Sequence, residues 1–236
     1  MKLRVVLFVA LLFLLLPVFV SAKDVWTSVS SRNFHLIGDA AESEIKQVAV
    51  KLEQFREIFR QIYPKAKLDS RIPTRILVFK NRDSYKPFKP IRADGEIDDL
   101  ITGHFQAGED VNYIAFSGVN DLAGTDSTLF HEYTHFVINN TYGRTNIPLW
   151  LEEGFAAYYQ TLRMENNGKA IVGKLSPVYL QILQEEPLIP FETFLSIDNQ
   201  SLHLQADSRT RNIFYVQSSA LLHYLQQGDK NRHRNG

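Results

Sequence analysis

His131-Glu132-Tyr133-Thr134-His135, or HEYTH, is the stretch that decides how this 236-residue chain is interpreted. In an α-helix, residues four positions apart lie on the same face, so His131 and His135 can both reach one ion. Glu132 lies about 100° round the helix and therefore borders that ion without covering it. This spacing is typical of a zinc site with its own general base, although a five-residue pattern also arises by chance. A third ligand is needed to support the interpretation.

The third ligand is expected in the segment 147–159, IPLWLEEGFAAYY. Catalytic zinc usually has three protein ligands and keeps its fourth position for water. Pro148 suits a first helical turn, and the apolar residues that follow recur as they do on a helix packed against a core. Glu152 and Glu153 lie in the first two turns. Gly154 indicates a close approach of another backbone or a substrate, because glycine costs about 1 kcal/mol in a helix interior. The alternative is a pair of surface glutamates on an ordinary amphipathic helix.

Together, HEYTH and the later WLEEGFAAY (150–158) resemble the gluzincin zinc metallopeptidases. The resemblance is closest to the peptidase MA-like family, which is related to the alanyl and leukotriene-hydrolase type aminopeptidases. In that family the Glu directly before Gly is the third zinc ligand, which corresponds to Glu153. The resemblance therefore implies a zincin-like fold and a Zn²⁺ ion held by His131, His135 and Glu153. The gap of 17 residues between His135 and Glu153 is one shorter than in the aminopeptidases, so Glu152 is kept as the alternative ligand.

A second segment, FYVQSSALLHYL at 214–225, resembles the family's segment in which a tyrosine precedes a helix that lines the cleft. In the relatives this tyrosine hydrogen-bonds the developing oxyanion, a role that corresponds to Tyr215 here. Hydrogen-bond donors in such a position stabilise the charge of the transition state. The alternative is a core tyrosine at a helix start, because the neighbouring apolar residues would form a buried face in any case.

The expected chemistry is hydrolysis of peptide bonds by metal-activated water. Zinc lowers the pKa of a bound water molecule to about 7, and Glu132 would accept its proton and pass it to the leaving amine. Aminopeptidase relatives bind the free N-terminal amine through a Gly-x-Met-Glu-Asn stretch before HExxH, which this chain lacks. We therefore expect a peptide or protein substrate and endopeptidase-like cleavage. The alternative function is a catalytically inactive binding module of the same fold that grips peptide or cell-wall material.

The order of the remaining segments predicts an α+β fold, in which a small mixed-sheet lobe is followed by a mainly helical lobe with the HExxH helix between them. Alternating or apolar runs predict strands at 31–37, 74–79 and 112–116. The strand at 112–116 is expected at the sheet edge, where an extended peptide could add to it.

Several polar residues are expected to mark helix starts and connections. Asp39 is predicted to cap a long amphipathic helix, and Thr125 or Asp126 to cap the HEYTH helix. The polar, proline-containing connection 81–99 could include a short helix near Tyr85. His35, His104, His203 and His223 are interpreted as structural, with an approach of His104 to the cleft as the alternative.

Residues 1–22 have the features of a secretory signal: a basic start, an apolar run and a small-residue cleavage site ending at Ala22. Cleavage there would give a secreted or periplasmic protein, whereas an uncleaved segment would anchor it to a membrane. The peptidase domain is then expected at 23–228, followed by a polar tail at 229–236. The chain has no cysteine, which excludes disulfides and thiolate ligands, and its formal net charge of zero gives no indication of nucleic-acid binding.

Overall fold

The structure is a computed structural model, and it describes residues 25–91, 95–98, 101–117, 122–143, 147–165, 169–174, 176–198, 201 and 207–232. The predicted signal segment 1–22 lies outside the described residues, as do His203 and the last four residues of the predicted tail. The described part is a mixed α+β structure with one small sheet and several helices, as the sequence predicted at that level.

Five strands form one mixed sheet in the order β1-β2-β3-β5-β4. The inner strands β2 (His35–Gly38), β3 (Thr74–Phe79) and β5 (Asn112–Ser117) are parallel to one another. The edge strands β1 (Thr27–Ser30) and β4 (Gly103–Gln106) each run antiparallel to their neighbour. The inner strands are rich in buried apolar side chains, as expected of strands covered on their faces.

The strand predictions are only partly right. The strand at 74–79 is confirmed. The strand predicted at 31–37 has the wrong bounds, because the chain turns there between β1 and β2. The strand predicted at 112–116 forms, but its edge position is wrong: β4 pairs along its outer side. The free edge nearest the HEYTH helix therefore belongs to β4, a strand that the sequence analysis did not predict.

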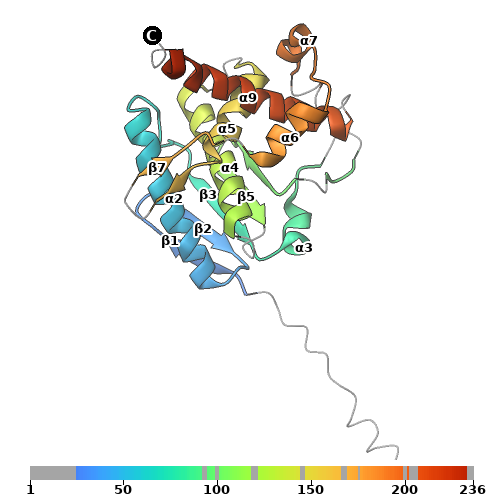
Figure 1. Cartoon of the computed structure of the whole chain (residues 1–236). Coiled ribbons are helices and arrows are strands. Elements are labelled where there is room, and N and C mark those ends of the chain that lie inside the picture. The colour runs from blue at the N-terminus through green and yellow to red at the C-terminus, as the bar shows by residue number, and fades with distance from the viewer. Residues whose placement is uncertain are drawn as a thin grey trace, which may run out of the picture.

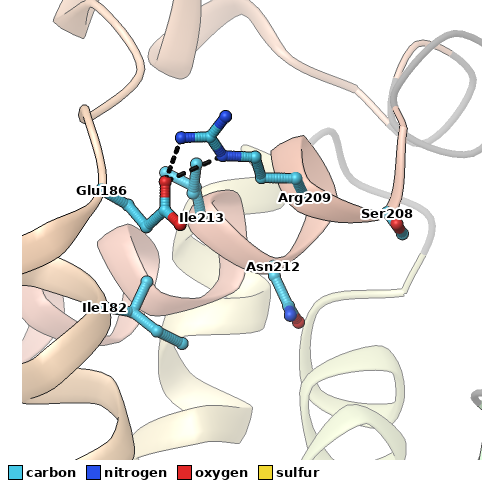
Figure 2. Close-up of a pocket in the computed structure, with 6 residues that line it drawn as sticks. All are labelled: Ile182, Glu186, Ser208, Arg209, Asn212 and Ile213. Carbon is cyan, nitrogen blue, oxygen red and sulfur yellow. Dashed lines mark hydrogen bonds and ion pairs between the residues drawn. The ribbon is translucent and has the colours of Figure 1, made fainter.

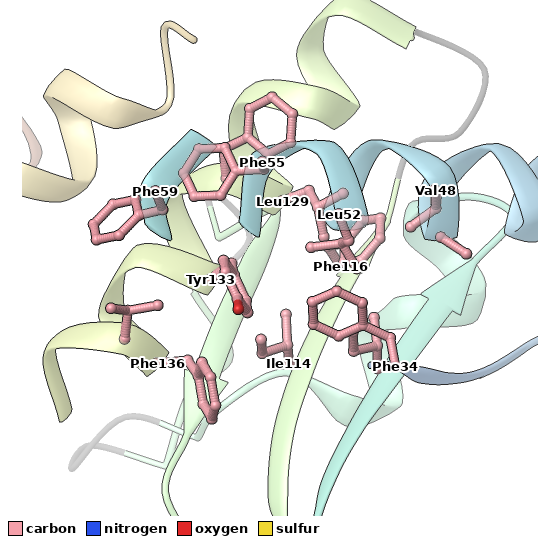
Figure 3. Packing of buried hydrophobic residues seen from close by; sticks show 14 of the residues in the cluster. Phe34, Val48, Leu52, Phe55, Phe59, Ile114, Phe116, Leu129, Tyr133 and Phe136 are labelled. Carbon is pink, nitrogen blue, oxygen red and sulfur yellow. The ribbon is translucent and has the colours of Figure 1, made fainter. Parts of the chain in front are cut away.

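The core lies between the sheet and two long helices, α2 (Glu42–Ile62) and α4 (Leu122–Tyr142). Phe55 of α2 stacks on Phe130 of α4 with ring centroids 4.4 Å apart, and Tyr133 meets Phe34 and Phe55 edge to face. Figure 3 shows Phe34, Phe55 and Tyr133 in the layer between these helices and the sheet. Burial of each such ring contributes about 1.5–3 kcal/mol. Because Tyr133 is buried on the core side, the two histidines of the motif are turned toward α5.

Both predicted helix caps are wrong. α2 begins at Glu42, and Asp39 instead accepts a hydrogen bond from the main-chain N–H of Lys80 at 2.9 Å. α4 begins upstream of Thr125 and Asp126, so neither residue caps it. Asp126 is a residue of α4 itself, and its carboxylate forms an ion pair with Lys51 of α2 at 2.6 Å. Each of the two aspartates therefore joins neighbouring elements.

The second half of the described chain is mainly helical, with α5 (Leu149–Tyr159), α6 (Pro177–Glu185), α7 (Phe191–Ser196) and α9 (Ser208–Arg232). α5 lies between α4 and α9 (Figure 1). The close approach predicted at Gly154 is confirmed: a Cβ atom there would lie 2.8 Å from the carbonyl oxygen of Ser218. α9 continues through Arg232, so the tail predicted from residue 229 begins as helix.

Shorter elements complete the fold. The predicted short helix near Tyr85 is confirmed as α3 (Arg82–Tyr85), followed by the 3₁₀ turn η1 (Lys86–Phe88). Tyr85 packs with Phe79 and Ala115 in a second, smaller core cluster. The strands β6 (Arg163–Met164) and β7 (Ala170–Ile171) form a hairpin after α5. Within the described residues, no helix combines the length and apolar character needed to cross a membrane.

Candidate metal centre

Two neighbouring helices bring together the three residues that the sequence predicted as metal ligands. His131 and His135 lie one turn apart on α4, and Glu153 lies in the second turn of α5. Gly143, with a φ of +68°, takes a left-handed conformation directly after α4, which favours glycine at a helix end. The packing of α4 against α5 then brings the three side chains together.

Three atoms converge at this point: Nε2 of His131, Nε2 of His135 and Oε2 of Glu153, called here the donor triad. The two imidazole nitrogens are 3.1 Å apart, and the carboxylate oxygen lies 3.5 Å from one and 3.6 Å from the other. A tetrahedral zinc ion with bonds of about 2.0–2.1 Å keeps its ligand atoms roughly 3.3–3.4 Å apart. The donor triad therefore has the size of one face of a zinc coordination tetrahedron.

Outer hydrogen bonds orient both imidazoles. Nδ1 of His135 donates to Oε1 of Glu152 at 3.1 Å, since a carboxylate oxygen accepts. Nδ1 of His131 lies 3.1 Å from Oε1 of Gln160, which likewise accepts. With a proton held on each Nδ1, Nε2 is the ring atom that faces the common point, and loss of the Nε2 proton on metal binding would leave a lone pair there. This is the tautomer that metal-ligating histidines need.

The surroundings of the Glu153 carboxylate also suit a bound cation. Its Oε2 atom is buried and has no hydrogen-bond partner among the described residues. Burial alone would raise the pKa of Glu153, but the imidazoles of His135 and His131 lower it below its usual value, so the carboxylate is ionised. A buried carboxylate oxygen without a hydrogen-bond partner is costly unless positive charge lies beside it. These residues therefore fit a divalent metal ion.

Glu132 borders the donor triad, as the helical spacing predicted. Its carboxylate is buried. Burial raises the pKa of Glu132, the imidazoles of His131 and His135 oppose the rise, and the Glu153 carboxylate adds to it. The main-chain N–H of Phe105 on β4 faces the Glu132 carboxylate and favours its ionised form. The candidate base therefore stands between the metal-ligand residues and the free edge of the sheet.

Tyr215 reaches the same region from α9, nearly two turns into the helix rather than at its start. Burial raises the pKa of its phenol, and the nearby carboxylates of Glu153 and Glu132 raise it further. Tyr215 is thus a protonated hydrogen-bond donor close to the donor triad. One turn earlier on α9, Arg211 forms an ion pair with Asp98 at 2.8 Å, and this pair fixes the start of the helix against the segment 95–98.

The structure also shows polar residues around the site that the sequence analysis did not single out. Gln160 lies seven residues after Glu153, two turns on along the same face, so helical spacing could have identified it. Tyr179 of α6 interacts with the Gln160 side chain. Tyr85 and Nδ1 of His104 are 2.7 Å apart, which explains His104 as a structural partner of a buried tyrosine. No local sequence pattern links these last residues to the site.

Glu152 and two further histidines lie outside the group of converging atoms. Glu152 is not a member of the donor triad, and it instead supports His135 from outside. His35 and His223 lie elsewhere in structural hydrogen bonds: His35 with Ser28, and His223 with the carbonyl oxygen of Gly173.

Among the described residues, two cavities border the helices α5, α6 and α9. The smaller, of about 350 Å³, lies between α6 and α9 and is bordered by the ion pair between Glu186 and Arg209 (Figure 2). It contains no residue of the donor triad. The larger, of about 730 Å³, lies among the C-terminal parts of α2 and α4 and the start of α5, and Glu152 is part of its wall.

No protein-family model matches the chain, and no curated protein sequence matches it. The description of the site therefore rests on the residues and their geometry.

Proposed function

We propose that this chain is a zinc-dependent peptidase of the gluzincin type that cleaves peptide bonds within a chain. The observation that carries the proposal is the donor triad, whose three atoms lie 3.1, 3.5 and 3.6 Å apart and include a buried carboxylate oxygen with no other partner among the described residues. His131, His135 and Glu153 would hold the ion. Zinc bound there would supply a Lewis acid that polarises a carbonyl and acidifies water.

The chain's own residues supply the proton transfers. Glu132 is buried and has a raised pKa, which makes it a stronger base than an exposed glutamate. It would take a proton from the attacking water and return it to the leaving amine. A purely structural metal site would gain nothing from a buried carboxylate in this position. Glu132 therefore favours a hydrolase over the alternative of an inactive binding module.

Tyr215 would stabilise the oxygen that becomes negative during the attack. Its phenol stays protonated far above neutral pH because burial and the two nearby carboxylates disfavour the phenolate. A fixed O–H donor directed at a developing oxyanion is the kind of group that lowers such a barrier.

β4 is the proposed place for the substrate backbone. In its pairing with β5, Phe105 is opposite Ile114 at the sheet edge, and its N–H faces Glu132. An extended peptide added along this edge would therefore pass the base. β4 has the sequence Gly-His-Phe-Gln, with no acidic residue to bind an N-terminal amine. This composition favours endopeptidase cleavage over aminopeptidase cleavage.

Digestion of a peptide library by the zinc-loaded chain, read by mass spectrometry, tests the proposal. Peptides with acetylated N-termini should be cut at internal bonds, and chelation followed by zinc addition should abolish and restore the cleavage. Removal of single residues from free N-termini would instead indicate an aminopeptidase. A chain that binds zinc and peptides but leaves every peptide intact would support the binding module.

A further inference from the structure

The larger cavity lies next to the candidate metal centre. Its wall is formed by residues 59–66 at the end of α2 and the turn after it, 137–142 on α4 and 147–155 at the start of α5. Ile138 and Tyr142 continue the α4 face that carries the two histidines, one and two turns beyond His135. Glu152 belongs both to this wall and to the hydrogen bond with Nδ1 of His135.

The chemistry of the cavity is almost wholly apolar. Phenylalanine, isoleucine, leucine, valine and proline side chains make up most of the wall, and two apolar residues at the rim are exposed: Ile62 at 42% and Tyr142 at 60%. A volume of about 730 Å³ is within the 300–1,000 Å³ range of small-molecule sites. A ligand in the cavity would cover these two exposed side chains together with the apolar wall behind them.

Two charged residues line the cavity, and they have different surroundings. The carboxylate of Glu152 is held by His135 on the inner side. Lys65 is exposed and has no ion-pair partner among the described residues. A ligand with a negative head group would be repelled by Glu152 and attracted by Lys65, so its head would lie at the mouth and its tail inside.

We propose that this cavity binds a long-chain carboxylate, with the hydrocarbon tail against the apolar wall and the carboxylate at Lys65. The site is separate from the donor triad, although Glu152 of its wall also hydrogen-bonds His135 of the triad. The proposal does not depend on the peptidase activity, because the cavity lies at the Nδ1 side of His135 and does not include the candidate base Glu132.

Isothermal titration calorimetry of the full-length, zinc-loaded chain with sodium laurate tests this proposal. We expect saturable binding of one laurate per chain, and affinity that rises roughly tenfold for each pair of methylenes from octanoate to laurate. Dodecyltrimethylammonium, which has the same tail and the opposite charge, should bind at least tenfold more weakly than laurate. Equal affinity for the two amphiphiles, or no saturable binding of laurate, would overturn the proposal.

Variants separate the head-group site from the tail site. Lys65→Glu should weaken laurate binding about tenfold or more, because the charge at the mouth is reversed. Lys67→Glu is the matched control, since it makes the same charge change at an exposed residue outside the wall, and it should change the affinity by less than about threefold. Ala66→Trp, at a half-buried position of the wall, should fill the cavity and abolish binding.

A variant is interpreted only if its circular dichroism spectrum and its zinc content equal those of the parent chain. If Ala66→Trp does not fold, Leu151→Trp and the chain-length series provide the same information about the tail. Parent-like laurate affinity in a folded, cavity-filling variant, or an equal loss in Lys65→Glu and Lys67→Glu, would place the ligand elsewhere. Sedimentation as a dimer with no laurate binding would assign the cavity to a second copy of the chain and overturn the proposal.

Discussion

Nδ1 of His135 lies 3.1 Å from Oε1 of Glu152, the residue directly before the third member of the donor triad. Two adjacent glutamates of α5 therefore approach the same imidazole from opposite sides, Glu153 at Nε2 and Glu152 at Nδ1. One can coordinate an ion, and the other can hold the imidazole in the tautomer that coordination requires.

This division of roles predicts different losses of zinc affinity. Glu152→Ala should weaken zinc binding by about 10–100-fold, the usual effect of removing an outer partner. Glu153→Ala should weaken it further, because a ligand is lost. Competition titration with a colorimetric chelator measures both constants. A larger loss in Glu152→Ala than in Glu153→Ala would reassign the third ligand to Glu152.

Replacing Glu132 by glutamine should abolish hydrolysis while the metal stays bound. The amide is nearly the same size as the carboxylate but cannot accept the proton, so kcat should fall by about 10²–10⁴-fold. Elemental analysis should still find one zinc per chain. Glu109→Gln, at an exposed position between β4 and β5, is the control and should leave kcat unchanged. Undiminished cleavage by Glu132→Gln would remove this residue from the mechanism.

Tyr215→Phe should slow the chemical step with little change in KM. The ring keeps its packing in α9 while the O–H donor is lost, and loss of one oxyanion donor typically lowers kcat by about 10²–10³-fold. Tyr224→Phe on the same helix is the matched control, because Tyr224 is 69% exposed. Steady-state kinetics on one internally quenched peptide separates kcat from KM. If both variants keep parent kcat, Tyr215 is only a packing residue.

Gly154→Ala should destabilise the fold, because α5 and α9 approach closely at this residue. The added methyl would lie 2.8 Å from the main-chain oxygen of Ser218 and 3.2 Å from Cβ of Leu222. Overpacking of this kind costs about 1–3 kcal/mol in the free energy of unfolding, which urea titration measures. Gly228→Ala in α9 is the control, because its nearest neighbour is the ring of the exposed Tyr224 at 3.3 Å. Equal stability of the two variants would contradict the close approach.

His104 should make the stability of the fold depend on pH. Burial lowers the pKa of His104 below the ordinary value near 6.5, so the unfolded chain binds the proton more readily than the folded chain. The neutral form therefore stabilises the fold above pH 6.5, and this contribution is lost as the pH falls through the lowered pKa. His104→Gln should remove it. Between pH 7.5 and 5, unfolding free energies should fall more steeply for the parent than for the variant; parallel curves would refute the assignment.

The sequence predicted the donor triad because the relevant spacings are local. His131, Glu132 and His135 follow from helical periodicity, whereas the choice of Glu153 over Glu152 came from the resemblance to the gluzincins. The edge position of β4 was not predictable in the same way, because strand order depends on pairings distant in sequence. The same holds for Asp39 and Asp126. Each looked like a helix cap by composition, but tertiary partners decide its role: Lys80, directly after β3, for Asp39 and Lys51 of α2 for Asp126.

The donor triad lies within residues 131–153, whereas Tyr215 arrives on the last helix. Closing so short a loop costs little chain entropy, so the three residues of the donor triad can come together once α5 packs on α4. Tyr215 joins them only when α9 docks on α5. Under the proposed function, a chain still lacking α9 would bind the ion before it could hydrolyse a peptide.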